Sequence, residues 1–262
     1  MRIRSAAISD TGIKREINED YYAIDNQSNL YIVADGMGGN LAGNVASEFA
    51  VRIIRKNIKH WIANDTDINE LFGFPDNSLS INGNYILSGI KLANRILYYM
   101  SEEYKRYKGM GTTVAVLNLM PASVIAANVG DTKIYLIRGD NIETISKDHT
   151  MVSEQYEMGI ISKEEAKASP LRHILTRNLG SSYNVNVDIF EIEPMENDCF
   201  LLCTDGLTDL VSNSLIFNIV RKGGDPEHLC NELIYQANNK GGLDNITVSM
   251  VFLDKLEKRK KK

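Results

Sequence analysis

One short stretch constrains this chain more than any other: an apolar run, an acid, three glycines and then a helical pattern. Residues 30–34 are apolar, long enough for a buried strand and too short for a helix. Asp35 follows directly, glycines stand at positions 36, 38 and 39, and from residue 42 apolar residues recur at i, i+3, i+4 spacing. This order favours a ligand site, because glycines let backbone carbonyls approach a ligand closely. A hairpin turn at Asp35 is the alternative, since Asp-Gly is a strong hairpin signal.

Two nucleotide-binding motifs can be tested on the same stretch. A dinucleotide fingerprint requires a third glycine at position 41, which is Leu41. It also requires an acid roughly twenty residues farther on, in a region occupied by Arg52, Arg55 and Lys56. A P-loop requires Gly-Lys-Ser or Gly-Lys-Thr after its glycines, and neither follows. The stretch therefore matches neither motif.

The composition is that of an ordinary soluble globular protein. The 262 residues fit one large domain or two small ones, with 44% hydrophobic and 24% charged residues. A net charge of −5 argues against a nucleic-acid-binding surface. The three cysteines, Cys199, Cys203 and Cys230, form no CxxC pair, which favours buried free thiols in a reducing compartment. Neither a signal peptide nor an apolar run of membrane-spanning length is found, so a cytoplasmic protein is expected.

Strand-like runs and helical periodicity are distributed along the whole chain. Besides 30–34, strands are predicted at residues 2–9, 21–24, 112–120, 123–129, 133–138, 199–204 and 246–253. Helices are predicted at 42–58, 90–104, 151–158, 163–168, 213–221 and 226–240, with an irregular loop at 63–84. Three more acids stand close to glycine at strand ends, as Asp35 does: Asp131, Asp205 and Asp244.

These four acids favour a hard divalent cation. Carboxylates, a backbone carbonyl and water are the oxygen ligands that Mg²⁺ and Mn²⁺ prefer. None of the four histidines is adjacent to the acids in the sequence, which argues against zinc, and no Gly-x-Ser-x-Gly elbow offers a serine nucleophile. Such a set favours metal-activated water that attacks phosphorus. Taken alone, Asp131 also fits a plain turn. The charged stretch 14–20 fits either a solvated loop or an anion-binding arginine beside cation-binding carboxylates.

Six short motifs occur in order along nearly the whole chain. They are Arg15-Glu-Ile-Asn-Glu-Asp20, Val33-Ala-Asp-Gly-Met-Gly-Gly39, Gly111-Thr-Thr113, Val129-Gly-Asp131, Thr204-Asp-Gly-Leu-Thr-Asp209 and Asp244-Asn-Ile-Thr247. This set resembles the metal-dependent Ser/Thr protein phosphatases of the type 2C (PPM) family, in their compact bacterial form. The resemblance implies an α+β fold of two packed antiparallel β-sheets flanked by α-helices, an α-β-β-α sandwich. It also implies a single catalytic domain at residues 1–254, with a flap at 147–180. The basic residues 255–262 are interpreted as a tail.

The resemblance further implies the metal site. Its cofactors would be two divalent cations, Mn²⁺ or Mg²⁺, with a third, weaker metal beside them. The implied ligands are oxygen donors: Asp35, the Gly36 carbonyl, Asp205, Asp244, Glu19, Asp20 and Asp131. Asp35 would bridge the two metals, Asp205 and Asp244 would complete one metal's shell, and Asp131 with Asp205 would hold the third. Glu19 would reach the second metal largely through water, with Asp20 close behind.

The implied activity is that of a protein serine/threonine phosphatase. A metal-bridged hydroxide would attack phosphoserine or phosphothreonine with no covalent enzyme intermediate. Asp35, Asp205 and Arg15 would carry catalysis, and Arg15 would hold the phosphate by a bidentate fork that lysine cannot reproduce. The expected protein is a monomer without a nucleic-acid partner, acting on phosphorylated proteins and opposing a Ser/Thr kinase. Two alternatives stay open: a catalytically weak regulatory scaffold of the same fold, and a phosphatase dedicated to one regulatory partner.

Four positions depart from the family pattern. Met37 and Asn40 stand where many members carry histidine, Lys133 replaces a usual arginine, and Ser169 replaces a usual flap histidine. None of these departures removes an implied metal ligand. However, neither Met37 nor Asn40 is able to donate a proton near neutral pH. The leaving group is therefore expected to take its proton from metal-bound water, unless one of the four histidines folds into the cleft.

Overall fold

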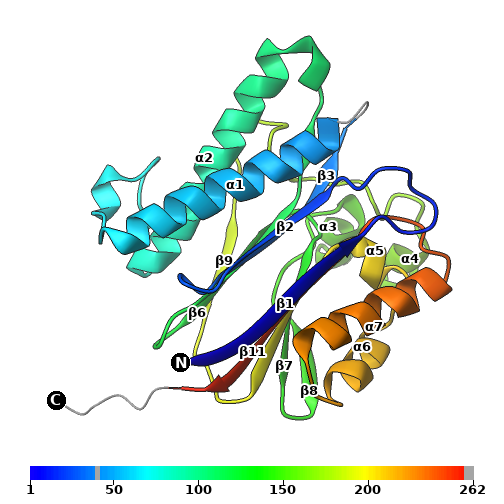
Figure 1. Cartoon of the computed structure of the whole chain (residues 1–262). Coiled ribbons are helices and arrows are strands. Elements are labelled where there is room, and N and C mark those ends of the chain that lie inside the picture. The colour runs from blue at the N-terminus through cyan, green and yellow to red at the C-terminus, as the bar shows by residue number, and fades with distance from the viewer. Residues whose placement is uncertain (39–41, 257–262) are drawn as a thin grey trace.

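The computed structural model describes residues 1–38 and 42–256, which contain two packed β-sheets with helices outside them (Figure 1). The first sheet has, in spatial order, β1 (Arg2–Asp10), β11 (Ile246–Lys255), β10 (Asp198–Cys203), β7 (Lys133–Arg138) and β8 (Asn141–Thr144). The second has β2 (Asp20–Asp25), β3 (Leu30–Met37), β5 (Val114–Leu119), β6 (Val124–Val129) and β9 (Asp188–Ile192), with β4 (Gly111–Thr112) paired to β3. Neighbouring strands are antiparallel throughout these two sheets.

Helices cover the outer face of each sheet. The second sheet carries α1 (Ala42–Ala63) and α2 (Ile81–Glu103), and the first carries α6 (Asn213–Val220) and α7 (Pro226–Asn239). The shorter helices are α3 (Met151–Glu157), α4 (Lys163–Ala168), α5 (Asp205–Thr208), η1 (Ile68–Glu70) and η2 (Lys105–Tyr107). The predicted four-layer α-β-β-α fold is therefore confirmed. Within the described residues, no helix is long and apolar enough to cross a membrane.

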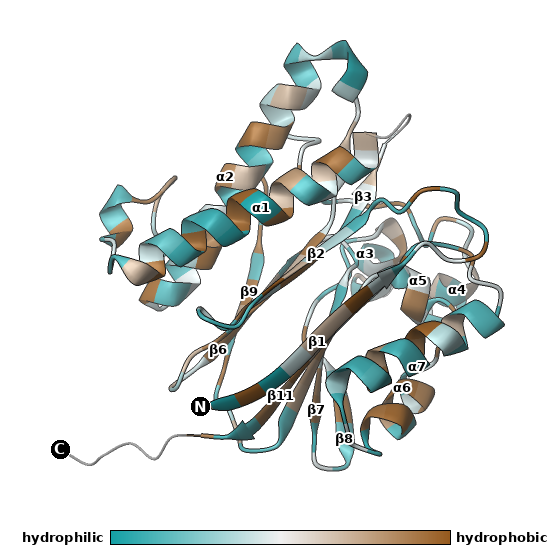
Figure 2. Ribbon diagram, in the orientation of Figure 1, coloured by the Kyte–Doolittle hydropathy of each residue, from teal (hydrophilic) through white to brown (hydrophobic). Residues whose placement is uncertain are grey.

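The central strands are apolar without interruption because both of their faces are buried. Successive side chains of a strand point to opposite faces. In β3, Leu30 and Ile32 pack with the helix-side core, whereas Tyr31 and Val33 pack between the two sheets. Strand β10 repeats the pattern with Phe200, which lies in the core between the sheets. Hydrophobic colour lies along the strands around β11 and β7 (Figure 2). Two-sided burial explains why a short apolar run predicted these strands well.

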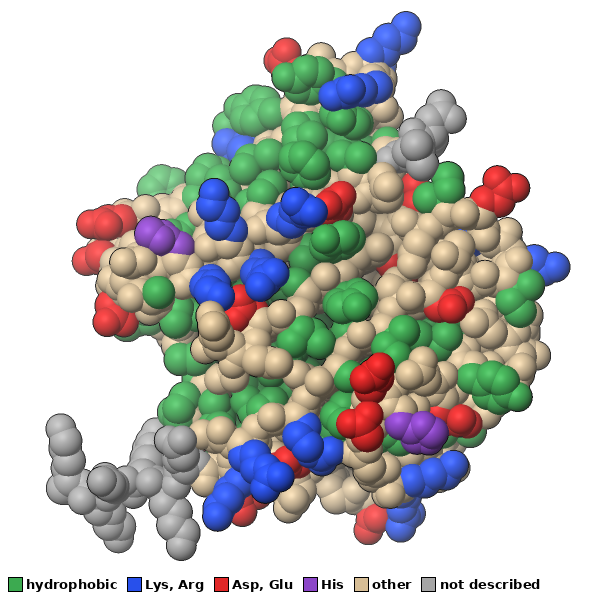
Figure 3. Space-filling model, in the orientation of Figure 1, with side chains coloured by type: hydrophobic (Ala, Val, Ile, Leu, Met, Phe, Trp, Pro, Cys, Tyr) green, Lys and Arg blue, Asp and Glu red, His purple; other side chains and the backbone are tan. Residues whose placement is uncertain are grey.

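Helices α1 and α2 are longer than predicted, because polar residues near their ends obscure the apolar periodicity. Helix α1 continues to Ala63 because Trp61 is buried and packs against Tyr85 of α2, with ring centroids 6.2 Å apart. Helix α2 begins at Ile81, inside the predicted loop 63–84, because Ser80 caps it by accepting a hydrogen bond from the Gly83 N–H. Charged side chains of both signs lie over the face of the molecule that Figure 3 shows.

Several other expectations have definite outcomes. The hairpin alternative at Asp35 is wrong, because Gly36 and Met37 continue β3 and pair with β4. The three cysteines are free and buried, as predicted. Strand β11 includes Lys255, the first residue of the predicted tail, and residues 257–262 lie outside the described residues. Elements β8, β9 and α5 were not predicted.

Candidate active site

Acids from both sheets meet at one end of the sandwich. Asp35 in β3 is the register partner of Asp20, the first residue of β2. Asp205 begins α5 directly after β10, Asp244 precedes β11, and Asp131 lies in the turn between β6 and β7. Burial raises the pKa of the Asp35 carboxyl well above its usual range, and the charges of the four other aspartates raise it further. The structure thus brings together all the aspartates that the sequence singled out.

Asp20 is the most enclosed of these acids. Its Oδ2 accepts hydrogen bonds from the hydroxyls of Thr204, at 2.9 Å, and Thr247, at 2.7 Å. Its Oδ1 is buried without a hydrogen-bond partner in the described structure, and so is Oδ1 of Asp205. Burial raises the pKa of Asp20 to about 7, although the two hydroxyls act in the opposite direction. Buried carboxylate oxygens without partners are costly, and a bound cation would satisfy them.

Glu19 lies where β2, β3 and the start of α1 meet. Its backbone carbonyl accepts hydrogen bonds from the Gly36 N–H, at 3.1 Å, and from the Ser47 hydroxyl. A Cβ on Gly36 would lie 2.1 Å from the Gly43 carbonyl oxygen, so only glycine fits there. Burial raises the pKa of the Glu19 carboxyl, while the backbone N–H of Gly43 lowers it. Residues 19 and 36 are therefore held side by side.

Arg15 lies at the rim of the acidic cluster. One guanidinium nitrogen, Nη2, donates a hydrogen bond to Asp244 Oδ2 at 2.8 Å, and about half of the side chain is exposed. This bond is the main reason that the pKa of Arg15 is raised. The guanidinium thus contacts the acidic cluster while about half of the side chain stays exposed, which argues against a purely solvated loop at residues 14–20. Its contact with phosphate stays a prediction.

Asn245 organises the approach to the site, a role that the sequence did not reveal. Its Oδ1 accepts a hydrogen bond from the Glu19 N–H at 2.9 Å, and its Nδ2 donates to the carbonyls of Thr11 and Ile17, both at 2.9 Å. A Cβ on Gly206 would lie only 2.0 Å from the Asn245 carbonyl oxygen. Asn245, the residue after Asp244, therefore holds the loop that carries Arg15 and Glu19.

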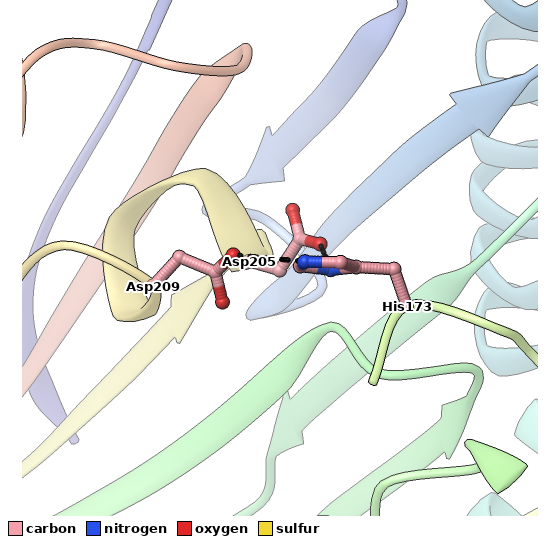
Figure 4. Close-up of side chains that lie close together, drawn as sticks. All are labelled: His173, Asp205 and Asp209. Atoms are coloured by element: carbon pink, nitrogen blue, oxygen red, sulfur yellow. Dashed lines mark ion pairs between the residues drawn. The ribbon is translucent and has the colours of Figure 1, made fainter. Parts of the chain in front are cut away.

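A histidine from the flap lies beside the acids, which is the case that the sequence left open. His173 Nδ1 lies 3.5 Å from Asp205 Oδ2, and its Nε2 lies 3.5 Å from Asp209 Oδ2 (Figure 4). The hydrogen bond to Asp205 raises the pKa of His173, and burial raises that of Asp209. Asp209 follows Asp205 by four residues, so helical spacing was the available signal. His173 is distant in sequence and had no such signal.

A second histidine, His149, supports the Asp131 turn from behind. It is buried, and its Nδ1 accepts a hydrogen bond from the Gly130 N–H at 3.0 Å. Its Nε2 lies 3.4 Å from Asp188, and burial lowers the pKa of the ring. Burial raises the pKa of Asp131 to about 7, with Asp205 as the next cause. His149 is thus a neutral support for the turn rather than a group inside the acidic cluster.

Two of the unusual positions have clear surroundings. The Lys133 ammonium forms an ion pair with Asp148, so it braces the start of the flap. The sulfur of Met37 lies 3.6 Å from Nδ2 of Asn178, near the end of the flap. Asn40 lies outside the described residues. Met37 therefore contacts the flap and supplies no proton donor.

Comparison with known proteins identifies relatives over nearly the whole chain. A family model described as Protein phosphatase 2C matches residues 13–225. The protein phosphatase PhpP of Streptococcus pneumoniae is 34% identical over 251 residues, covering 94% of this chain and 96% of PhpP. The solved structure of serine/threonine phosphatase Stp1 from Staphylococcus aureus has a TM-score of 0.84 at 32% identity, covering 97% of this chain and 96% of Stp1. A structure of the PstP catalytic domain in complex with two manganese ions has a TM-score of 0.77 at 28% identity, covering 95% and 97%.

Proposed function

The chain belongs to the protein phosphatase 2C family and is a protein serine/threonine phosphatase, and we propose that its acidic cluster is the catalytic centre. Its cofactors are two divalent cations, in line with the two manganese ions of the PstP complex. The observation that carries the proposal is the pair of buried carboxylate oxygens without partners, Oδ1 of Asp20 and Oδ1 of Asp205. These carboxylate oxygens suit divalent cations because Mg²⁺ and Mn²⁺ prefer oxygen ligands, and because bound cations would offset the repulsion between the carboxylates.

The residues that would hold the cations come from both sheets. Asp35 and the Gly36 carbonyl lie on β3, Glu19 directly precedes β2, and Asp205 and Asp244 flank β10 and β11. Asp20 holds its place through Thr204 and Thr247 and so lies behind these ligands. Asp131, with Asp205, would hold the third, weaker metal. Bound divalent cations supply a water nucleophile of lowered pKa and counter-charge for the phosphoryl oxygens.

Arg15 and His173 would act on the phosphate and on the leaving oxygen of the substrate. Arg15 would exchange its bond to Asp244 for a fork to two phosphoryl oxygens, which fixes the orientation of the phosphate. His173 lies against Asp205 and is the histidine that the sequence left open as a proton donor. Its ring, whose two nitrogens lie beside Asp205 and Asp209, would deliver a proton to the serine or threonine oxygen. Water therefore need not be the only acid.

The substrates are phosphorylated proteins, and the finer points are proposals. The phosphatase would act as a monomer in the cytoplasm, in signalling that opposes a Ser/Thr kinase. Residues 1–254 would form one catalytic domain, since both sheets contribute to a single site and share the core between them. The convergence of all the predicted acids argues against a regulatory scaffold that has lost its metals.

Hydrolysis of matched phosphoserine, phosphothreonine and phosphotyrosine peptides tests the function. The expected result is turnover of the first two with Mn²⁺ or Mg²⁺, and none after chelation. Asp35→Asn should abolish turnover while keeping the fold, because the amide is isosteric but neutral. Undiminished turnover after exhaustive chelation would contradict the metal site, and absence of turnover with every metal would favour the scaffold.

A further inference from the structure

A cavity of about 1020 Å³ lies beneath the flap and extends well beyond the acidic cluster. It is lined by Asp131 and Asp205 of the acidic cluster and also by residues outside the cluster, such as Asn213 and Lys240. Residues of the flap helices α3 and α4 contribute to the lining, as do residues of β7, α5 and the start of α6. The volume is at the upper end of small-molecule pockets. A chain segment continuing from a phosphorylated residue at the acids would enter this space.

The lining of the cavity also carries positive charge. Six lining residues are cations: Lys133, Lys147, Lys163, Lys167, Arg172 and Lys240. Lys133 is paired with Asp148, and Lys240 donates a hydrogen bond to the Leu210 carbonyl. The side chains of the other four form no ion pair or hydrogen bond with any described residue. These four side chains are exposed, and they line the same cavity as Asp131 and Asp205.

Acids do not balance these four cations. Five lining residues are acidic: Asp131, Asp148, Glu157, Asp205 and Asp209. Three of them belong to the acidic cluster or contact His173, and Asp148 is paired with Lys133. Only Glu157 among the lining acids remains beside the four cations. The cavity that contains acids of the catalytic cluster is therefore also lined by four cations without a partner among the described residues.

Three of these four cations are carried by segments that are held in place by hydrogen bonds. Lys163 and Lys167 stand one turn apart on α4 and both line the cavity, although like charges at this spacing destabilise a helix. A capping box at Ser162 and Glu165 nonetheless holds the helix start. At the start of the flap, Lys147 has its backbone bound to Asn128, with the Lys147 carbonyl accepting at 2.6 Å. Such spacing on a capped helix suits a ligand with more than one negative charge.

We propose that this cavity selects phosphoproteins that carry further negative charge next to the phosphorylated residue, an inference that rests on the proposed phosphatase function. The flanking anions would be aspartate or glutamate side chains, or a second phosphate, because all of these pair with lysine and arginine. Lys147, Lys163, Lys167 and Arg172 would be the residues that read them. Substrates with neutral or basic flanks would bind less tightly.

The test compares kcat/KM for matched phosphothreonine peptides with Mn²⁺ present. One peptide carries three aspartates after the phosphothreonine, one carries them before it, one carries a second phosphothreonine, and one has alanines on both sides. The wild type should prefer at least one anionic peptide over the alanine peptide. In the Lys163→Gln/Lys167→Gln double variant that preference should fall about fivefold, mainly through KM, because each exposed charge contact contributes modestly.

Controls separate the charge effect from loss of structure. Lys56→Gln/Lys105→Gln removes two exposed lysines outside the cavity and should leave the preference unchanged. If the α4 variant unfolds at a lower temperature than the wild type, the Lys147→Gln/Arg172→Gln variant tests the other two cations of the cavity. High salt should reduce the wild-type preference. A preference confined to the doubly phosphorylated peptide identifies a second phosphate as the anion.

Two results would have different meanings. If the wild type hydrolyses all the peptides with equal kcat/KM, or if the α4 variant loses the same factor on the alanine peptide, the selectivity proposal is overturned. If no phosphopeptide is hydrolysed with any divalent cation, the proposed function itself fails.

Discussion

Without its cations, the folded protein should lose stability as the pH rises, because the acidic cluster is then left uncompensated. The clearest case is Asp20, which is 6% exposed, has one oxygen without a partner and has a pKa raised from 3.8 to about 7. A group whose pKa is higher in the folded state binds its proton more tightly there. Its stabilising effect is complete below the unfolded pKa and is lost as the pH rises through the folded pKa.

The size of the effect follows from the two pKa values. Each unit of difference corresponds to about 1.4 kcal/mol, so the full loss from Asp20 is on the order of 4 kcal/mol. Between about pH 5 and pH 8, roughly 2–3 kcal/mol of that loss should be visible. Asp35 and Asp131 act in the same direction, but they share charges with Asp20 and their effects are not additive. Compared with a total free energy of unfolding of about 5–15 kcal/mol, this loss is large.

Urea unfolding in the presence of chelator, at several pH values in that range, measures the slope. The free energy of unfolding should fall as the pH rises, and Mn²⁺ should stabilise more at pH 8 than at pH 5. Asp20→Asn is the matched variant, because it removes the titrating group and keeps an oxygen for Thr204 and Thr247. Over this pH range, its free energy of unfolding should fall by up to about 2–3 kcal/mol less than that of the wild type. A flat or rising wild-type curve, or an unchanged slope in the variant, would refute the reasoning.

Three further predictions concern single residues. Arg15→Lys keeps the charge but loses the fork, so KM for a phosphothreonine peptide should rise with little change in kcat, and an unchanged KM would exclude a phosphate contact. His173→Gln should remove the high-pH fall in kcat for phosphothreonine but not for an aryl phosphate, which needs no acid; identical profiles for variant and parent would return that role to water. Gly206→Ala would place a Cβ 2.0 Å from the Asn245 carbonyl, so turnover should fall by more than about tenfold and the urea midpoint should drop, as paired kinetics and unfolding would show.

The sequence predicted the buried parts of the fold best. Strands β3 and β10 are buried on both faces, so their apolar runs are continuous and end sharply at Asp35 and Asp205. Those sharp ends are also why the acids could be located. Strand β8 lies at a sheet edge with mostly exposed residues, and α5 is only four residues long. Neither presents enough apolar pattern for periodicity to detect.

Contacts made between distant segments could not be predicted from local pattern. His173 reaches Asp205 across the flap, and nothing in the residues around position 173 encodes that approach. Asn245 was visible only as part of a motif, and its three hydrogen bonds depend on how residues 11–19 fold over it. The unpaired cations of the cavity are likewise scattered between residues 147 and 172. These groups become a surface only after the flap has folded.

The position of Asp20 connects the chemistry of the site with the stability of the whole sandwich. Asp20 belongs to the second sheet, and the two hydroxyls that bind it, from Thr204 and Thr247, belong to the end of β10 and to β11 in the first. Asp131 likewise lies in the chain segment that passes from one sheet to the other. Cations held by Asp35 on one sheet and by Asp205 on the other would therefore join the two sheets at this end. Since the hydroxyls alone leave one Asp20 oxygen without a partner, bound metal should stabilise both sheets together rather than the loops alone.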